Sequence, residues 1–338
     1  MAYFWAMVFV TGGSGLVGSH LLLDLLRSGQ EVRALCRPGS DLDRVRDLFR
    51  WYGPQEMALY EKIEWVPGNL TDLPSLDAAM EGASVVYHCG ALISFDPRDQ
   101  GRLLKTNQEG TRNIVNLCLH KEIPRLYYTS SIATIGGTQG TLSEKDLWDP
   151  VHTNVYATSK YLAEMEVWRG AQEGLQTVIV NPGVILGPGF WSGGSGKFFS
   201  GVAAGLKIAP PGGTGFVGVW DVVRALTALG DHQCLCERFV LVTENLEYAV
   251  LLEKIARLLE VAPPKSVLKG WQLEILWRLD WMRSHLGGRK RRLSKAIARS
   301  LQMPVQYSSE KIKQRIGFRF QPLEQVLREC ADNFRNAL

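Results

Sequence analysis

The 338-residue sequence predicts an α/β fold, a doubly wound parallel sheet with a smaller, mainly helical region toward the C-terminus. Short apolar runs alternate with helical segments through the first half of the chain, which is typical of a parallel sheet covered on both faces. A glycine cluster at 12–18 lies between the first apolar run and the first predicted helix. After Pro182 the residue composition changes, because glycine and proline become frequent up to residue 218, which is typical of a loop-rich region.

The elements follow in order along the chain. Six strands are expected, at 3–10, 32–36, 63–66, 84–88, 126–129 and 175–180. Helices are expected between them, at 16–26, 72–80, 102–119 and 154–172. Beyond the loop-rich region come a strand at 239–242 and a helix at 247–259, and Pro263-Pro264 then introduces a basic, helical terminal segment.

Composition excludes several classes of protein. With 46% hydrophobic and 21% charged residues, the chain is neither collagen-like, disordered nor a small disulfide scaffold. Its net charge of +4 is unevenly distributed. Residues 1–264 carry 22 basic and 28 acidic side chains, a net charge of −6, whereas residues 265–338 carry 16 basic and 6 acidic side chains, a net charge of +10.

Two features could mislead. The first 23 residues carry no charge, but glycines interrupt the apolar run and no basic stretch precedes it, so a strand and a loop are expected rather than a targeting or spanning segment. The six cysteines do not form a disulfide framework, and Cys234-Leu-Cys236 has no second pair that would complete a metal site. No metal is expected, and the expected compartment is the cytosol.

The glycine cluster indicates a dinucleotide. Gly12, Gly15 and Gly18 lie between a strand and a helix, where glycines let the backbone turn tightly and approach a pyrophosphate at the positive helix N-terminus. The residues expected to hold the cofactor here are Thr11, Gly12, Ser14, Gly15, Leu16, Val17 and Gly18. The predicted dinucleotide-binding domain is 1–181, with 215–243 returning to it, and 182–214 and 244–338 form the substrate-binding region.

The end of the second strand bears on the choice of cofactor. A carboxylate there would bind the ribose hydroxyl of NAD, whereas an arginine favours the 2′-phosphate of NADP. This strand runs into Arg37, and the next acid is Asp41. NADP(H) is therefore favoured, and NAD(H) stays possible.

A YxxxK pair, Tyr156 and Lys160, places a phenol and an amine one turn apart on a helix. Ser131 follows the fifth strand 25 residues earlier, at the expected cofactor site. Lys160 could supply the cation that a tyrosine needs to act near neutral pH, Ser131 could polarise a substrate oxygen, and Tyr156 could exchange a proton with it. A second pair, Tyr307 and Lys311, is interpreted as a helix start with an incidental lysine.

These motifs resemble the extended short-chain dehydrogenase/reductases, the NAD(P)-dependent epimerase/dehydratase family. The resemblance rests on TGGSGLVGSHLL (11–22), VYHCGA (86–91), NQEGTRNIV (107–115), YYTSSIATIGG (127–137), YATSKYLAE (156–164), NPGVILGPG (181–189), VWDVVRAL (219–226) and YSSEKIKQRIGF (307–318). It implies a homodimer and further cofactor contacts at Asn69, Leu70, Cys89, Gly90, Ala91, Asn107, Thr129, Lys160, Pro182, Gly183 and Val184. Asn69 and Trp220 depart from the acids that the family usually has at these positions.

The branch of the family decides the substrate. Nucleotide-sugar members usually carry a diphosphate-binding arginine that the stretch Thr214–Asp221 lacks, although Lys197 could substitute for it. The chain looks more like the dihydroflavonol-4-reductase-type proteins, which act on small apolar carbonyls. Candidate substrate residues are Ser94, Ser131, Asn181, Phe190, Trp191 and Lys197. A nucleotide-sugar epimerase/dehydratase and a catalytically silent dinucleotide-binding protein remain as alternatives.

The basic terminal segment, 268–299, has two interpretations. Apolar residues recur at helical spacing, at Leu268, Trp271, Ile275, Leu279, Met282 and Leu286. Seven cations and no acid lie between Asp280 and Glu310. The favoured interpretation is a stripe that faces the core, with a solvated basic face. The alternative is a helix on an anionic membrane surface, or one that caps an apolar substrate. No nucleic-acid partner is expected.

Overall fold

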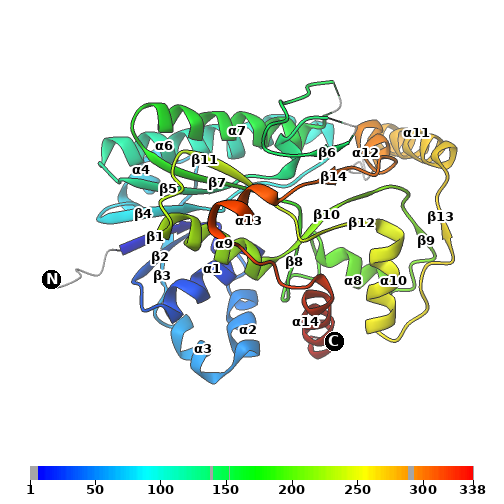
Figure 1. Cartoon of the computed structure of the whole chain (residues 1–338), viewed down its shortest axis with the longest axis horizontal. Coiled ribbons are helices and arrows are strands. Elements are labelled where there is room, and N and C mark those ends of the chain that lie inside the picture. Colours follow the sequence, from blue (N-terminus) through cyan, green and yellow to red (C-terminus); the bar gives the residue numbers. More distant parts are fainter. Residues whose placement is uncertain (1–6, 138–139, 152, 288–292, 338) are drawn as a thin grey trace.

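The computed structural model describes residues 7–137, 140–151, 153–287 and 293–337. Its centre is a parallel sheet with the strand order β11-β7-β5-β4-β1-β2-β3 (Figure 1). These strands are β1 Met7–Thr11, β2 Val32–Cys36, β3 Glu64–Pro67, β4 Ala83–His88, β5 Arg125–Thr129, β7 Gln176–Pro182 and β11 Glu237–Leu241. The predicted doubly wound sheet is therefore confirmed, and the direction of strand progression reverses between β1 and β4.

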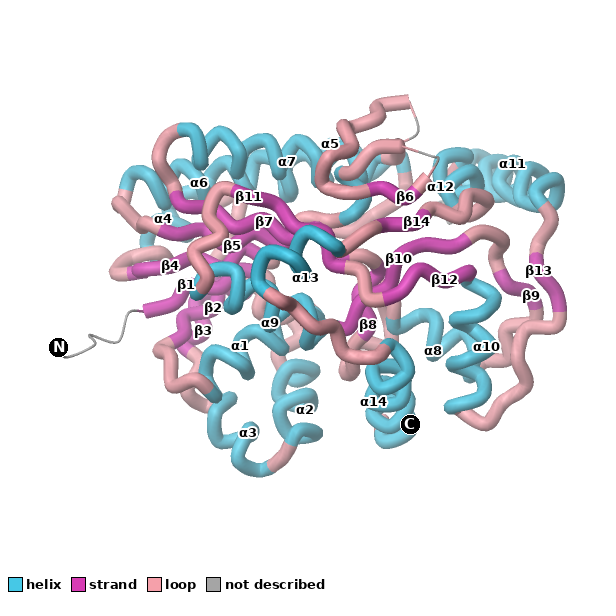
Figure 2. The backbone as a smooth tube through the Cα atoms, in the orientation of Figure 1, coloured by secondary structure: helices cyan, strands magenta, loops and turns pink. Residues whose placement is uncertain are grey.

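Helices cover both faces of this sheet (Figure 2). One face packs against α1 Leu16–Arg27, α2 Asp43–Tyr52, α3 Pro54–Tyr60 and α9 Val219–Asp231. The other packs against α4 Leu73–Ala79, α6 Gly110–His120 and α7 Val155–Gln172. Each face encloses its own cluster of buried aliphatic and aromatic side chains, as expected when the strands are apolar on both sides.

A smaller part follows the sheet. It contains the three-stranded sheet β12-β10-β8 and a third apolar cluster. Its elements are β8 Val184–Leu186, α8 Gly196–Ala203, β9 Ile208–Ala209, β10 Gly213–Gly218, β12 Glu244–Glu247, α10 Tyr248–Leu258, β13 Ser266–Val267, α11 Gly270–Gly287, α12 Lys295–Ser300 and α14 Leu323–Asn336. The strand pair of β6 Thr141–Leu142 with β14 Gln306–Tyr307 and the helix α13 Glu310–Ile316 connect it to the main sheet, whereas β9 pairs with β13 within the smaller part.

Some elements differ from the sequence prediction. The expected helix at 102–119 is divided among the end of α5 Gln100–Leu103, the π-helix η2 Leu104–Glu109 and α6, and η1 Pro97–Asp99 precedes them. The helices α2 and α3 were not expected, because the 41–60 segment is highly charged and interrupted by Gly53-Pro54. Within the segment 215–243, β10 joins the small sheet, whereas α9 and β11 return to the large one.

The cysteines are free thiols, and three of them, Cys118, Cys234 and Cys330, are buried. Burial raises the pKa of the Cys118 thiol to about 12, so it is neutral and packs as a small apolar side chain. Among the described residues, no group of His, Cys, Asp and Glu could hold a metal ion.

Candidate dinucleotide and catalytic site

The candidate site lies where the strand order reverses, at the carboxyl ends of β1 and β4. These strands pair in register, so that Thr11 lies opposite His88. The Thr11 Oγ1 is 2.6 Å from His88 Nδ1 and accepts a hydrogen bond from the Gly90 backbone at 3.2 Å. Burial lowers the pKa of His88 to about 3, helped by the Lys160 cation, so the imidazole is neutral and fastens the two strand ends together.

The glycine loop between β1 and α1 leaves no room for side chains at two positions. Gly12 has a φ of +75°, and a Cβ there would lie 2.6 Å from the Gly90 nitrogen. A Cβ on Gly18 would lie 2.1 Å from the Gly12 carbonyl oxygen. Gly15 caps α1 without a side chain, so the first N–H groups of the helix face the loop uncovered. This cradle fits a dinucleotide pyrophosphate, which binds to open backbone N–H groups at a helix N-terminus.

The far end of the predicted cofactor groove lies at β2 and β3. Arg37 directly follows β2 and is exposed, and within the described chain its guanidinium makes no ion pair or hydrogen bond. Asn69 is exposed and accepts a hydrogen bond from the Thr71 backbone at 3.3 Å, whereas Leu70 is buried. Arg37 is therefore free to bind a phosphate, and Asn69 is partly committed to its own turn.

Asn107 joins the segment after β4 to the catalytic helix. From the π-helix η2, its side chain accepts a hydrogen bond from the Leu92 backbone at 2.7 Å and donates to the Leu92 carbonyl at 3.0 Å. It also donates to Ser159 Oγ at 2.9 Å, next to Lys160 on α7. Asn107, which the resemblance implies as a cofactor contact, is thus a positioning residue next to the catalytic helix.

Lys160 lies inside the site with almost no exposure. Its Nζ donates to the Tyr128 hydroxyl at 2.7 Å and to the Thr129 carbonyl at 2.8 Å, and it lies 4.4 Å from the centre of the Tyr128 ring. Burial lowers the pKa of Lys160 to about 7, although the nearby Glu164 carboxylate raises it. The ammonium is thus held against β5, one turn along α7 from Tyr156.

Tyr156 begins the catalytic helix and remains half-buried. Its ring meets Phe95 edge to face at 5.4 Å. Burial raises the pKa of Tyr156 to about 12, and the nearby Ser131 hydroxyl offsets only part of that effect. The expected lowering of this pKa by Lys160 is not observed, because the ammonium is bound to Tyr128 and Thr129 instead.

A buried carboxylate supports the Ser131 loop from behind. Glu164, one turn beyond Lys160, accepts hydrogen bonds from Ser130 at 2.5 Å, Thr134 at 2.9 Å and Asn181 at 2.8 Å. It also forms an ion pair with Arg238, its Oε1 lying 3.2 Å from Nη1. Asn181 was expected to contact substrate, but it is fully buried and its amide donates to this network and to the Ser131 carbonyl. Asn181 therefore braces the Ser131 loop.

Other predicted substrate residues also have structural tasks. Ser94 donates to Asp99 at 2.7 Å, Phe190 lies against the Arg44 guanidinium of α2, and Trp191 packs on Phe199 in the third apolar cluster. Trp191 is partly buried in the third apolar cluster, and its role as a substrate contact stays a prediction. Lys197 is exposed in the first turn of α8.

The predicted nicotinamide-side residues gather at the same sheet edge. Cys89 Sγ lies 3.3 Å from Thr129 Oγ1, which links the ends of β4 and β5, and the exposed Ala91 follows. Pro182 ends β7, and Gly183 turns the chain into Val184 and β8, where a Cβ on Gly183 would lie 2.4 Å from the Gly215 carbonyl oxygen. The structure thus brings these segments beside Ser131 and Lys160.

The second YxxxK pair has a different setting. Tyr307 ends the short strand β14, and its backbone exchanges hydrogen bonds with the Asn245 side chain. Lys311, on α13, donates to the Arg238 carbonyl and pairs with Glu237. Tyr307 and Lys311 therefore lie on different elements and have separate contacts.

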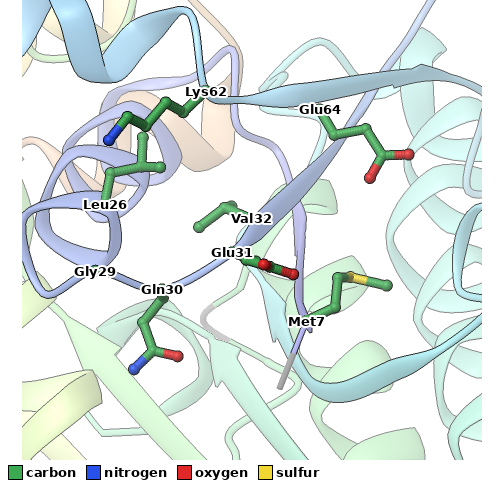
Figure 3. Close-up of a pocket in the computed structure, with 8 residues that line it drawn as sticks. All are labelled: Met7, Leu26, Gly29, Gln30, Glu31, Val32, Lys62 and Glu64. Carbon is green, nitrogen blue, oxygen red and sulfur yellow. The ribbon is translucent and has the colours of Figure 1, made fainter. Parts of the chain in front are cut away.

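One concave region lies far from this site. It is lined by eight residues at the amino ends of β1, β2 and β3, including Glu31, Lys62 and Glu64 (Figure 3). Ligands of doubly wound sheets bind at the opposite, carboxyl ends of the strands. This depression is therefore no part of the candidate site.

Sequence reasoning missed Tyr128, Phe95 and Glu164. Tyr128 is concealed in an apolar strand, and Phe95 lies in an irregular loop after β4. Glu164 carried a signal that could have been used: it continues the four-residue spacing of Tyr156 and Lys160 along one face of α7.

Comparison with known proteins identifies the family of this chain. The family described as "NAD dependent epimerase/dehydratase family" matches residues 8–238. A Synechocystis sp. protein provisionally named a dihydroflavonol 4-reductase is 30% identical, covering 97% of this chain and 94% of its own. Tetraketide alpha-pyrone reductase 2 of Arabidopsis thaliana is also 30% identical, over 64% of this chain and 71% of its own.

Solved structures share the fold. The crystal structure of gox2253 superposes with a TM-score of 0.80 at 25% identity, covering 98% of both chains. UDP-glucose 4-epimerase of Thermotoga maritima gives a TM-score of 0.76 at 18% identity, covering 98% of this chain and 99% of its own. The chain therefore belongs to the NAD dependent epimerase/dehydratase family, the extended short-chain dehydrogenase/reductases, and is an NAD(P)-dependent oxidoreductase of its dihydroflavonol-4-reductase-like branch.

Proposed function

We propose that the protein is an NADP(H)-dependent reductase of small, apolar carbonyl compounds, acting through Ser131, Tyr156 and Lys160. The observation that carries the proposal is that the half-buried Tyr156 lies beside Ser131 and against the exposed ring of Phe95. It puts two hydroxyl groups together beside an apolar ring. The two hydroxyl groups can bind a carbonyl oxygen, and the Phe95 ring can contact the apolar part of the same substrate.

The chain's own residues have separable roles in this reaction. The phenol of Tyr156, with a pKa of about 12, is protonated at neutral pH and can donate its proton to the substrate oxygen. Ser131 orients that oxygen, and Lys160 supplies positive charge close to the ribose position. A bound dihydronicotinamide supplies the hydride for the carbonyl carbon. Thr11, Gly12, Gly15 and Gly18 would hold its pyrophosphate.

Replacing Tyr156 by phenylalanine tests the proton donor. We expect kcat/KM for NADPH-dependent carbonyl reduction to fall about 10²- to 10⁴-fold, the usual contribution of a positioned general acid. Dinucleotide binding, measured by fluorescence titration, should be unchanged. Tyr307→Phe is the matched control, because it removes the same hydroxyl from the second YxxxK pair and should leave turnover intact. Full activity of Tyr156→Phe would refute the mechanism.

Preference for NADP(H) is tested at Arg37. A guanidinium hydrogen-bonded to a phosphate contributes about 1.5–3 kcal/mol. We therefore expect Arg37→Ala to weaken NADPH binding about tenfold or more and to leave NADH binding unchanged. Arg257→Ala, which removes an exposed arginine from α10, serves as the control. If Arg37→Ala weakened both cofactors equally, or neither, the assignment would fail.

Nucleotide-sugar conversion is the second candidate, favoured by the exposed Lys197 in the first turn of α8. A panel of aldehydes, ketosteroids, flavonoid ketones and nucleotide sugars separates the two candidates. Oxidation of NADPH with the apolar carbonyls supports the reductase. Conversion of a nucleotide sugar without net change of cofactor would replace it.

A further inference from the structure

The helix α11 carries an apolar face that points to solvent. Trp271, Ile275, Leu279 and Met282 follow one another at spacings of four, four and three residues, which places them on one side of the helix. Their exposed fractions are 61%, 48%, 53% and 49%. The expectation that this stripe faces the core is therefore wrong, and its former member Leu286 lies outside the side chains that the structure describes.

The opposite side of α11 is the one that packs. Leu273 is 2% exposed and Ser284 is buried, and α12 lies against this helix. Asp280 accepts a hydrogen bond from the Leu293 backbone at 2.9 Å. The helix is thus docked through its other face, and the exposed stripe is not a core surface that remains to be packed.

The apolar surface extends beyond the helix. Residues Val267 on β13 and Ile208 on β9 are exposed on a strand pair that leads into α11, at the outer end of the molecule (Figure 1). We define the α11 patch by its exposed apolar residues: Ile208, Val267, Trp271, Ile275, Leu276, Leu279, Trp281 and Met282. Exposed apolar side chains gathered on one helix and on the strand pair that leads into it mark an interaction site.

Positive charge is frequent along the chain on both sides of α11. Lys265 and Lys269 are exposed just before the helix, Arg278 is exposed on it, and Lys295 and Arg299 are exposed on α12, which packs against it. The two acids on the helix are already paired, Glu274 with Arg278 and Asp280 with Arg283. From Trp281 to Ser309 the sequence contains no acid at all.

We propose that the α11 patch docks the protein on the surface of an anionic phospholipid bilayer. Tryptophans at the edge of an aliphatic stripe suit the boundary between headgroups and acyl chains, and the cations before, along and after α11 suit anionic headgroups. None of the helices in the described part of the chain is long and apolar enough to cross a membrane. The contact is therefore interfacial.

Charge also argues against a second copy of this chain as the occupant. Packing of two α11 patches against each other would bring the basic segments of two copies close together, and like charges opposed across an interface disfavour association. An anionic surface instead satisfies the apolar stripe and the basic segments at the same time.

Vesicle co-sedimentation of the full chain tests the proposal, without substrate or dinucleotide, so that its outcome is independent of the proposed reaction. We expect binding to vesicles of equal parts phosphatidylserine and phosphatidylcholine at low salt, weaker binding at high salt, and little binding to phosphatidylcholine alone. Lys295→Gln/Arg299→Gln should weaken anionic binding on the order of tenfold.

Matched variants measure how much the apolar side chains contribute to vesicle binding. Trp271→Ser/Leu279→Ser should reduce partitioning on the order of tenfold, whereas Leu73→Ser, which removes a comparably exposed leucine from α4, should not change it. Thermal melts check that each variant is folded. Absence of binding to the anionic vesicles, or unchanged binding of Trp271→Ser/Leu279→Ser, would overturn the proposal. A concentration-dependent dimer that Trp271→Ser/Leu279→Ser abolishes would also overturn it.

Discussion

The ammonium of Lys160 experiences opposing influences on its charge. Burial at the end of β5 disfavours the protonated form, whereas the buried Glu164 carboxylate favours it. Hydrogen bonds to the Tyr128 hydroxyl and the Thr129 carbonyl hold the amine in place in either case. The resulting pKa of about 7 lets this residue titrate in a range where most lysines stay charged.

This pKa predicts how stability varies with pH. The folded value of about 7 lies below the ordinary lysine value of about 10.4. Between these values the unfolded chain binds a proton that the folded chain has released, so stability should increase with pH, by at most about 1.4 kcal/mol per pH unit. We expect the wild-type protein to gain stability relative to Lys160→Met from pH 7 to pH 9 in denaturant melts.

A constant difference between the two proteins over that range would show that Lys160 is not perturbed. Lys313→Met, which changes an exposed lysine on α13, provides the control and should show no such slope.

At the level of elements, α1 and the glycine loop act as one unit. Gly15 starts the helix without a side-chain cap, and the Ser19 backbone donates to its carbonyl at 2.9 Å. Gly18, in the first turn, lies so close to Gly12 that the backbone of the helix packs directly against the backbone of the loop. The position of the helix N-terminus therefore depends on this glycine.

Substitution of Gly18 by alanine should displace the helix from the loop. The new Cβ would lie 2.1 Å from the Gly12 carbonyl oxygen, which is backbone and cannot rotate away. We expect a loss of about 1–3 kcal/mol in unfolding free energy, as for other overpacked sites, and dinucleotide binding weakened at least about tenfold. Gly201→Ala, in α8 with open space around it, should preserve binding and stabilise the helix slightly. Unchanged dinucleotide affinity of Gly18→Ala would show that the loop adapts.

At the scale of the whole molecule, the two parts are interlocked. Two elements from the second half of the chain belong to the first part. The strand β11 forms one edge of the large sheet, and the helix α9 packs beside α1. Asp221 on α9 is fully buried and accepts hydrogen bonds from the Gln321 backbone at 3.1 and 3.2 Å. The C-terminal helix α14 then fills the third apolar cluster.

We therefore expect residues 1–181 alone not to fold cooperatively. Without β11 and α9, buried residues such as Val178, Val180 and Leu22 would become exposed. Thermal unfolding followed by circular dichroism should give a single transition for the full chain and no sharp transition for the fragment. A cooperative melt of the fragment would mean that the dinucleotide-binding half is an autonomous domain.

Much of the fold was predictable because its signals are local. Apolar runs of the right length marked the strands of the large sheet, and glycine spacing marked the loop after β1. The π-helix η2 was not predictable, because its register is set by Asn107 reaching Leu92 and Ser159. The exposed stripe of α11 was misjudged, since helical spacing identifies a face but not what lies against it.

Chain order and residue chemistry were thus sufficient for the doubly wound sheet, the cofactor loop and the residues Ser131, Tyr156 and Lys160. These features could be predicted because each depends on residues that are close together in the chain. Only the tertiary structure showed the burial of Lys160 against Tyr128, the use of Asn181 as a brace and the outward face of α11. Burial and partner choice at these positions arise from segments far apart in sequence, so no local pattern encodes them.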